Sequence, residues 1–364
     1  MISSGLPKPE ALQTAFENHL QGFFTRHQTA FRYGEMLEPI FYDLCEFVGR
    51  KGKRIRPLLF LLTYRALGGR QPANHPGLMD CAVALELLHS FILIHDDVID
   101  RSETRRGLPT FHKLAERRLS ALSAAERTGQ NVAIVVGDMV FALAVKTLHE
   151  ADIDPAVRQE LVSRFLAYAA DTGGGEIFDV LMGVRDITRV SMDDVARMYY
   201  LKTTRYTFEA PCVMGALLAG VDGDQVKALQ KVTEPLGLAF QIDNDLQEFA
   251  RFVSGDLSSS ADLLEGKKTF LMLEAYEHLD EVDRTFLQMC LSAPTRTEST
   301  ILKIQGLVQK ADAVARLRRK SQELFSQAEL ALRDDAWSDD QRESLESMFK
   351  TVRSRFSPVS VRSV

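Results

Sequence analysis

Three carboxylates stand close together at the end of a long apolar segment. Leu85 to Asp100 reads as one helix, and it ends with Asp96, Asp97 and Asp100. Because residues four apart share a helix face, Asp96 and Asp100 point the same way, with Asp97 about 100° round. Such oxygen ligands suit a hard divalent cation and leave positions for a phosphate oxygen. An isolated cluster of this kind is more often a solvated helix end, so its surroundings decide.

The loop after this cluster is basic. It carries Arg101 and the adjacent pair Arg105 and Arg106. A planar guanidinium offers paired N–H donors that match the oxygens of a diphosphate. Acids and arginines together therefore favour a metal-bound diphosphate over a solvated surface.

A second acidic cluster lies far downstream. Gln241, Asp245 and Glu248 are spaced by four and three residues, so they share one helix face, with Asn244 beside them, whereas Asp243 turns away. Alone, this would be a polar stripe. Two acidic clusters that face each other across a helical bundle would hold several Mg²⁺ ions around one diphosphate.

Further cations and hydroxyls supply anion-binding groups. Gly52 to Pro57 is a basic turn with Lys53 and Arg56 just before an apolar helix, whose free N–H groups add to the attraction for anions. His89 lies seven residues before Asp96, on the same helix face. The other candidate anion-binding residues are Lys202, Thr203 and Lys267. None of these groups indicates an anion site by itself.

These residues must be positioned by helices. Apolar residues recur at three- and four-residue spacing throughout, which predicts an all-α protein. Gly, Pro and Ser clusters predict breaks at Gly68-Gly69, at Gly107 to Pro109, at Gly173 to Gly175 and around Ser254 to Ser260. The clearest helices are Pro57 to Ala66, Leu78 to Asp100, Gln130 to Ala151, Pro155 to Gly173, Met192 to Gly220, Gly223 to Phe252 and Lys268 to Leu279.

Composition excludes several classes of function. The 364 residues include 44 basic and 50 acidic side chains, and the net charge of -6 without a long basic block argues against a nucleic-acid partner. The four cysteines have no CxxC spacing, which argues against a zinc site or a disulfide framework and favours a reducing cytoplasm. No secretory signal is expected in Met1 to Glu10, and no segment is expected to span a membrane.

The order of these motifs resembles the trans-isoprenyl diphosphate synthase (polyprenyl synthetase) family, from about Tyr42 to Tyr276. The resemblance implies an all-α bundle around a deep central cavity, usually a homodimer, with residues 1–364 as one domain, a motif-bearing core at about 42–280 and peripheral helices at 281–356. The motifs that carry it are GKRIRP, ELLHSFILIHDDVIDRSETRRGLPTFH, VVGDMVFALA, YYLKTTRYTFEAPCVMGALLAG, GLAFQIDNDLQEF and EGKKTFLML.

The resemblance also implies a reaction. Members join an allylic diphosphate to isopentenyl diphosphate with about two or three Mg²⁺ ions. It assigns metal binding to Asp96, Asp97, Asp100, Asn244, Asp245 and Glu248. It assigns isopentenyl diphosphate to Lys53, Arg56, His89 and Arg106. It assigns the allylic diphosphate and its ionisation to Arg105, Lys202, Thr203, Gln241 and Lys267, together with the first aspartates.

Product length in this family depends on residues below the first acidic motif. Phe91 lies five positions before Asp96, about 7.5 Å down the helix axis, with the smaller Ile92 next to it. An aromatic residue there implies C15 to C20 products, with geranylgeranyl diphosphate first.

Two departures from the family pattern leave alternatives open. The second motif is normally DDxxD, but here it has Asn244 and Glu248, and Asp256 follows Gly255 where a family lysine is expected. One alternative is a class I terpene cyclase, which would need no isopentenyl site. Another is a non-catalytic subunit of a synthase. A third class is an HD-type phosphohydrolase that uses His95 and Asp96, with His89 or His112 as further metal ligands.

Overall fold

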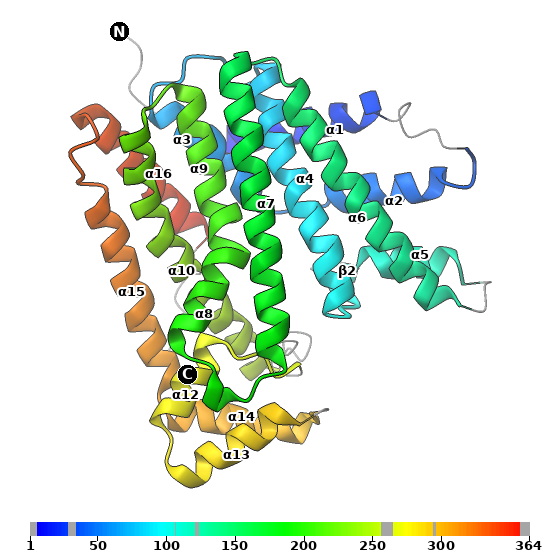
Figure 1. Ribbon diagram of the computed structural model, residues 1–364, viewed down its shortest axis with the longest axis vertical. Coiled ribbons are helices and arrows are strands. Elements are labelled where there is room, and N and C mark those ends of the chain that lie inside the picture. Colours follow the sequence, from blue (N-terminus) through cyan, green and yellow to red (C-terminus); the bar gives the residue numbers. More distant parts are fainter. Residues whose placement is uncertain are drawn as a thin grey trace. The chain divides into compact units, whose positions relative to one another are not determined.

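The structure, a computed structural model, is built almost entirely of helices (Figure 1). It describes residues 6–27, 34–105, 107–120, 124–255, 265–293 and 296–356. The prediction of an all-α fold is confirmed. The elements are α1 (Pro9–His27), α2 (Glu38–Gly49), α3 (Ile55–Ala66), α4 (Pro76–Ile99), β1 (Thr104–Arg105), β2 (Leu108–Pro109), α5 (Phe111–Arg118), α6 (Ala125–Glu150), α7 (Pro155–Gly183), η1 (Ile187–Arg189), α8 (Met192–Tyr199), η2 (Tyr200–Glu209), α9 (Ala210–Ala219), α10 (Gly223–Val253), α12 (Phe270–His278), α13 (Glu281–Ser292), α14 (Glu298–Lys310), α15 (Ala313–Ala331) and α16 (Asp339–Phe356).

The chain forms two compact units. Unit 1 comprises residues 1–166 with 217–219, and unit 2 comprises residues 167–216 with 220–364. The first acidic motif and the basic loop belong to unit 1, whereas the second acidic motif belongs to unit 2.

Helix α4 is the core helix of unit 1. It starts with Pro76 at its first turn, where a missing N–H costs nothing, and its middle is Leu- and Ala-rich. Leu85 and Leu88 are fully buried, and burial of each such side chain contributes roughly 1.5–3 kcal/mol. Helices α3, α5 and α6 pack around α4, so the acidic end of α4 follows a buried helical segment.

A short hairpin follows the acidic end of α4. Strands β1 and β2 pair antiparallel with Arg105 opposite Leu108, and Gly107 takes a positive φ of 76° at the turn. The Thr110 hydroxyl donates to the Ser102 carbonyl at 2.8 Å and closes the loop. The hairpin therefore returns Arg105 towards the carboxylates that precede it.

Helix α10 plays the corresponding role in unit 2. Its start is fixed by a capping box in which Asp222 and Gln225 each accept from the other's backbone N–H. It packs along α15 and against η2, and α15 lies beside it in Figure 1. The second acidic motif occupies the carboxyl-terminal half of α10, and α15 is the C-terminal helix with the most extensive packing on it.

The predicted break at Gly173 to Gly175 is wrong, because α7 continues to Gly183. A Cβ at Gly175 would lie 2.3 Å from the backbone nitrogen of Lys202. The glycine permits a close approach of α7 to η2, and this tertiary packing outweighs its low helix propensity.

The predicted helix from Met192 to Gly220 changes its winding midway. Residues 200–209 form a π-helix, η2, between α8 and α9. Wide π turns are rare and occur often at functional sites, and this one carries Lys202 and Thr203.

Two described helices, α4 and α6, are long and apolar enough to span a membrane by length and composition alone. In α4, 72% of the apolar window is buried inside the structure. A core helix of a globular protein passes the same test, so the apolar character of α4 is accounted for by its packing against α3 and α6.

Candidate active site

The carboxylates of the first motif are held by one arginine. Arg105 donates from Nη2 to Asp96 Oδ2 at 3.0 Å and from Nε to Asp97 Oδ1 at 2.8 Å. The Asp96 side chain is 17% exposed, whereas that of Asp97 is fully buried. Asp96 and Asp100 are both half-buried, so the geometry separates two accessible carboxylates from an inner one.

Burial perturbs the inner carboxylate. Desolvation raises the pKa of Asp97 to about 6, and the neighbouring Arg105 opposes part of this rise. Among the described residues, Asp97 Oδ2 is buried without a hydrogen-bond partner. An unsatisfied carboxylate oxygen beside two accessible carboxylates is a donor set that fits a hard divalent cation. The role of Asp97 as a direct metal ligand stays a prediction.

The basic turn Gly52 to Pro57 is divided between solvent and core. Lys53 is exposed, Arg56 is only 7% exposed, and both precede or open α3. His89 is half-buried on α4. Arg106 and Asp256 lie outside the described residues.

The second motif has the face that its spacing predicts. Asp245 is 7% exposed; its Oδ1 accepts from Gln241 Nε2 at 3.2 Å, and its Oδ2 accepts from the Tyr199 hydroxyl. Asp243 faces the opposite way and accepts from Ser321 on α15 at 2.7 Å. Asn244 and Glu248 are half-buried. The sequence prediction did not include Tyr199, which its place beside Lys202 could have suggested.

Two carboxylates of α7 were also missed. Lys202 Nζ lies 2.8 Å from Glu176 Oε2 and 2.7 Å from Asp179 Oδ2. Lys267 Nζ lies 3.9 Å from the same Asp179 oxygen. The structure thus brings both predicted allylic-diphosphate lysines to one α7 surface. The spacing of Glu176 and Asp179, three residues apart after a glycine run, was the available signal.

A buried network holds the π-helix that presents Lys202. Glu209 is fully buried at the end of η2. It accepts from the Tyr168 hydroxyl at 3.1 Å, the Tyr200 hydroxyl at 3.0 Å and Gln230 Nε2 at 2.7 Å. Three donors offset the cost of burying this carboxylate, so η2 is anchored on α7 and α10.

The predicted product-length residue lies in an aromatic cluster. The rings of Phe91 and Phe141 are 5.1 Å apart, and those of Phe91 and His95 are 4.8 Å apart. Phe91 and Ile92 are both half-buried. The His95 ring nitrogen Nε2 lies 2.9 Å from the Ile134 carbonyl, so His95 is directed towards α6.

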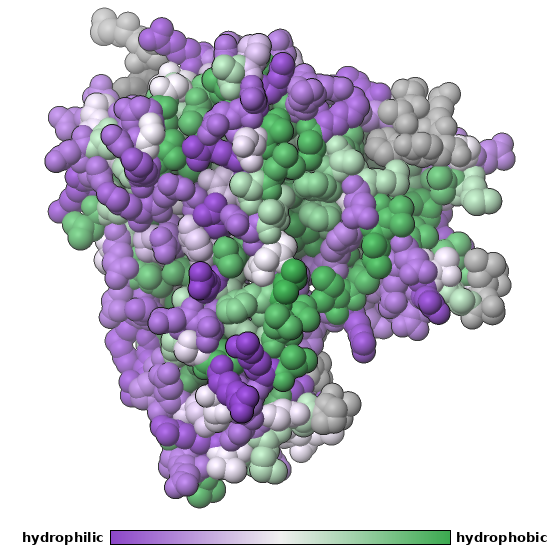
Figure 2. Space-filling model, viewed as in Figure 1, coloured by the Kyte–Doolittle hydropathy of each residue, from purple (hydrophilic) through white to green (hydrophobic). Residues whose placement is uncertain are grey.

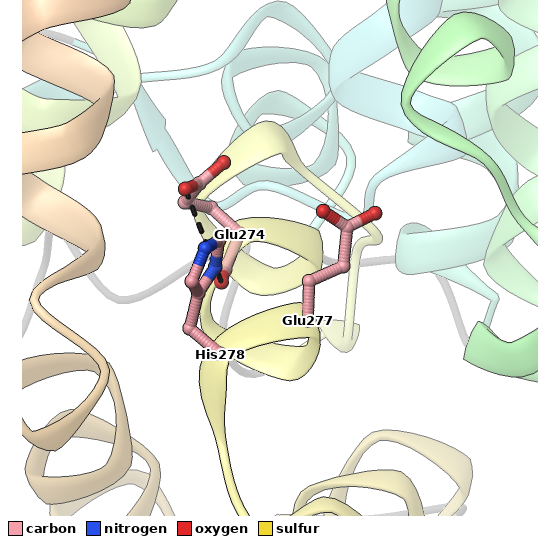
Figure 3. Close-up of side chains that lie close together, drawn as sticks. All are labelled: Glu274, Glu277 and His278. Atoms are coloured by element: carbon pink, nitrogen blue, oxygen red, sulfur yellow. Dashed lines mark hydrogen bonds and ion pairs between the residues drawn. The ribbon is translucent and has the colours of Figure 1, made fainter.

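Another acidic group on α12 is separate from these motifs. Glu274, Glu277 and His278 lie close together (Figure 3), with His278 Nδ1 3.4 Å from Glu274 Oε1. Glu277 and His278 are exposed. Exposed acids of this kind are common on helix surfaces, and no metal is assigned to them.

Helical architecture and the two acidic motifs define the class of the protein, an all-α fold of the isoprenoid synthase type. A solved geranylgeranyl pyrophosphate synthase from Corynebacterium glutamicum superposes with a TM-score of 0.82 at 24% identity, covering 96% of this chain and 98% of that one. The polyprenyl synthetase family model matches residues 38–308. The chain belongs to the polyprenyl synthetase family, which confirms the resemblance that its motifs indicated.

Sequence relatives carry related names. A short chain isoprenyl diphosphate synthase from Methanothermobacter thermautotrophicus is 33% identical over 242 residues, covering 64% of this chain and 66% of that protein. A farnesyl diphosphate synthase from Geobacillus stearothermophilus is 35% identical over 202 residues, covering 54% and 61%. The chain therefore spans less than two thirds of the length of these relatives.

Proposed function

We propose that this protein is a prenyltransferase that condenses an allylic diphosphate with isopentenyl diphosphate, head to tail, in isoprenoid biosynthesis. Membership of the polyprenyl synthetase family supports the reaction class. The observation that carries the proposal is the pairing of Arg105 with Asp96 and Asp97 at the end of α4, since it assembles anion- and cation-binding groups at one place. From the family resemblance we also propose that the Gln241 to Glu248 motif of unit 2 binds Mg²⁺ and the allylic diphosphate.

The chain's own residues would bind and orient both substrates. Arg105, Lys202 and Lys267 would bind the allylic diphosphate, whose leaving group gains negative charge as its C–O bond breaks. For Lys202 this requires release from Glu176 and Asp179, which occupy its ammonium in the present structure. Lys53, Arg56, His89 and Arg106 would hold isopentenyl diphosphate so that its double bond attacks the allylic carbon. The carbocation formed by this attack then loses a proton to the diphosphate that was released from the allylic substrate.

Magnesium is the cofactor that fits these residues. Asp96, Asp97 and Asp100 would hold it in unit 1; Asn244, Asp245 and Glu248 would hold it in unit 2. Bound Mg²⁺ would neutralise negative charge on the diphosphate as the allylic C–O bond breaks. Asn244 is a neutral ligand and lowers the attraction of the second motif for cations.

The alternatives are less well supported. A terpene cyclase has no use for Lys53, Arg56 and His89, which are all present, and a complete first acidic motif argues against a non-catalytic subunit. An HD phosphohydrolase needs His95 as a metal ligand, whereas its ring lies 2.9 Å from the Ile134 carbonyl.

Product length, assembly and location are finer parts of the same proposal. Phe91, backed by Phe141, would limit products to C15 to C20, with geranylgeranyl diphosphate first. We infer that residues 1–364 act as one catalytic domain in a cytoplasmic homodimer. An exposed apolar stripe on α7 supports the dimer, and Figure 2 shows hydrophobic surface over the lower part of this helix.

One assay tests the proposal. Purified protein is incubated with Mg²⁺, labelled isopentenyl diphosphate and the C5, C10 or C15 allylic diphosphate, and products are sized by chromatography. Elongated C15 to C20 diphosphates are expected. Cyclic hydrocarbons without incorporated label would identify a cyclase, and phosphate release without a new carbon–carbon bond would identify a hydrolase.

A further inference from the structure

Arg54, the arginine between Lys53 and Arg56, has a side chain that is buried away from solvent. Arg54 is 6% exposed, and it is the residue that caps the start of α3. Its backbone has a positive φ of 48°, a conformation that non-glycine residues seldom adopt. The surrounding contacts must therefore maintain this turn.

The Arg54 side chain ties the loop to the core helix. Its Nη1 lies 2.5 Å from Glu86 Oε1 on α4, and the two side chains are only 4% and 7% exposed. The same guanidinium donates to the Val48 carbonyl at 3.2 Å and to the Arg50 carbonyl at 2.9 Å. One side chain thus joins the end of α2, the loop and α4.

Two further contacts connect the loop to its neighbours. Arg50 Nη1 donates to the Pro109 carbonyl at 2.7 Å, which links the loop to the hairpin that carries Arg105. Gln13 on α1 donates to the Gly52 carbonyl at 3.2 Å. The loop is therefore braced on α1, α4 and the hairpin.

We propose that Arg54 and Glu86 form a positioning pair that sets Lys53 and Arg56 against His89. Glu86 precedes His89 by one helical turn on α4, so the pair fixes the loop at the level of that histidine. This inference rests on the proposed function, in which these three residues bind isopentenyl diphosphate. A buried ion pair adds little net stability compared with apolar residues, whereas it specifies one loop position, and a misplacement of about 1 Å lowers activity about a hundredfold.

The first variant is Glu86→Gln, which keeps the side-chain shape and removes the charge. The KM for isopentenyl diphosphate should rise about tenfold or more. The KM for the allylic diphosphate should stay within about twofold, because neither Arg54 nor Glu86 is among the residues proposed to bind the allylic substrate.

A matched control separates positioning from general weakening. Asp43 on α2 forms an ion pair with Arg118 on α5 in the same unit. Asp43→Asn should lower the melting temperature and leave the KM for isopentenyl diphosphate unchanged. An equal rise of this KM in both variants would overturn the inference.

The charge-free double variant Arg54→Met with Glu86→Leu gives the second arm. Replacement of both partners by apolar side chains can recover the stability lost when one partner is removed. The effect on KM can then be measured without a change in melting temperature. A raised KM at wild-type melting temperature supports positioning; a wild-type KM contradicts it. If the unmodified protein forms no elongated product, the proposed function fails; if it is active and Glu86→Gln keeps its KM, only this inference fails.

Discussion

At the scale of single residues, the electrostatics of the first motif separate its three aspartates. Asp96 and Asp100 are reachable by a cation, whereas Asp97 is buried beside Arg105. Spacing on the helix predicted that Asp97 lies away from the other two. Its burial was not predictable, because it depends on the hairpin that returns Arg105.

The first prediction concerns the pH dependence of stability. Burial raises the pKa of Asp97 from the ordinary 3.8 to about 6, so the folded state binds this proton more tightly. The stability gained from this tighter proton binding by Asp97 is fully present below pH about 4 and is lost as the pH rises through about 6. The free energy of unfolding of metal-free Asp97→Asn, minus that of the wild type, should therefore be larger at pH 8 than at pH 4. The increase should be up to about 3 kcal/mol.

Thermal unfolding in chelator at both pH values measures this difference. The wild-type protein at low pH, with Asp97 protonated, is the internal reference for the amide. An identical melting-temperature difference between the two proteins at both pH values would refute the burial argument.

At the scale of elements, long apolar periodicity was the reliable signal. The predicted helix Leu78 to Asp100 corresponds to α4, Pro76–Ile99, and Gly223 to Phe252 corresponds to α10, Gly223–Val253. The π winding of η2 and the continuation of α7 through its glycines were missed, because both arise from contacts between distant segments. For the same reason Glu176, Asp179 and Tyr199 were not predicted as partners of Lys202 or Asp245.

A pair of alanine variants tests the close approach of α7 to η2. A Cβ at Gly175 would lie 2.6 Å from the Lys202 Cα, whereas a Cβ at Gly174 would meet nothing within 4 Å. Gly175→Ala should destabilise the protein by about 1–3 kcal/mol and weaken allylic substrate binding. Gly174→Ala, its control, should be neutral or stabilise by up to about 1 kcal/mol.

Urea unfolding and the KM for the allylic diphosphate measure the two effects. Equal stability of the two alanine variants would show that the α7–η2 contact does not require glycine.

At the scale of the whole molecule, the exposed stripe on α7 predicts self-association. The stripe comprises Ile177, Val180 and Leu181 on α7, which are 63%, 48% and 51% exposed, and Val184, which directly follows the helix end at Gly183 and is 84% exposed. Packing of such a stripe against a second copy of the chain removes apolar surface from water. Val184→Lys should therefore shift the protein from dimer towards monomer in light scattering after size exclusion.

The control for this variant is Val282→Lys on α13. Val282 is 78% exposed and lies outside the stripe, so this change should leave the molar mass unaltered. A monomeric wild-type protein, or a Val184→Lys protein that remains a dimer, would contradict the role of the stripe.

The elongation rates of acidic-motif variants show directly whether each motif binds Mg²⁺ and a diphosphate. With saturating substrates and Mg²⁺, Asp96→Ala and Asp245→Ala should each lose about a hundredfold or more in kcat, whereas Asn244→Asp should be as fast as wild type or faster. Full activity in Asp96→Ala or Asp245→Ala would show that the altered motif is not needed for catalysis.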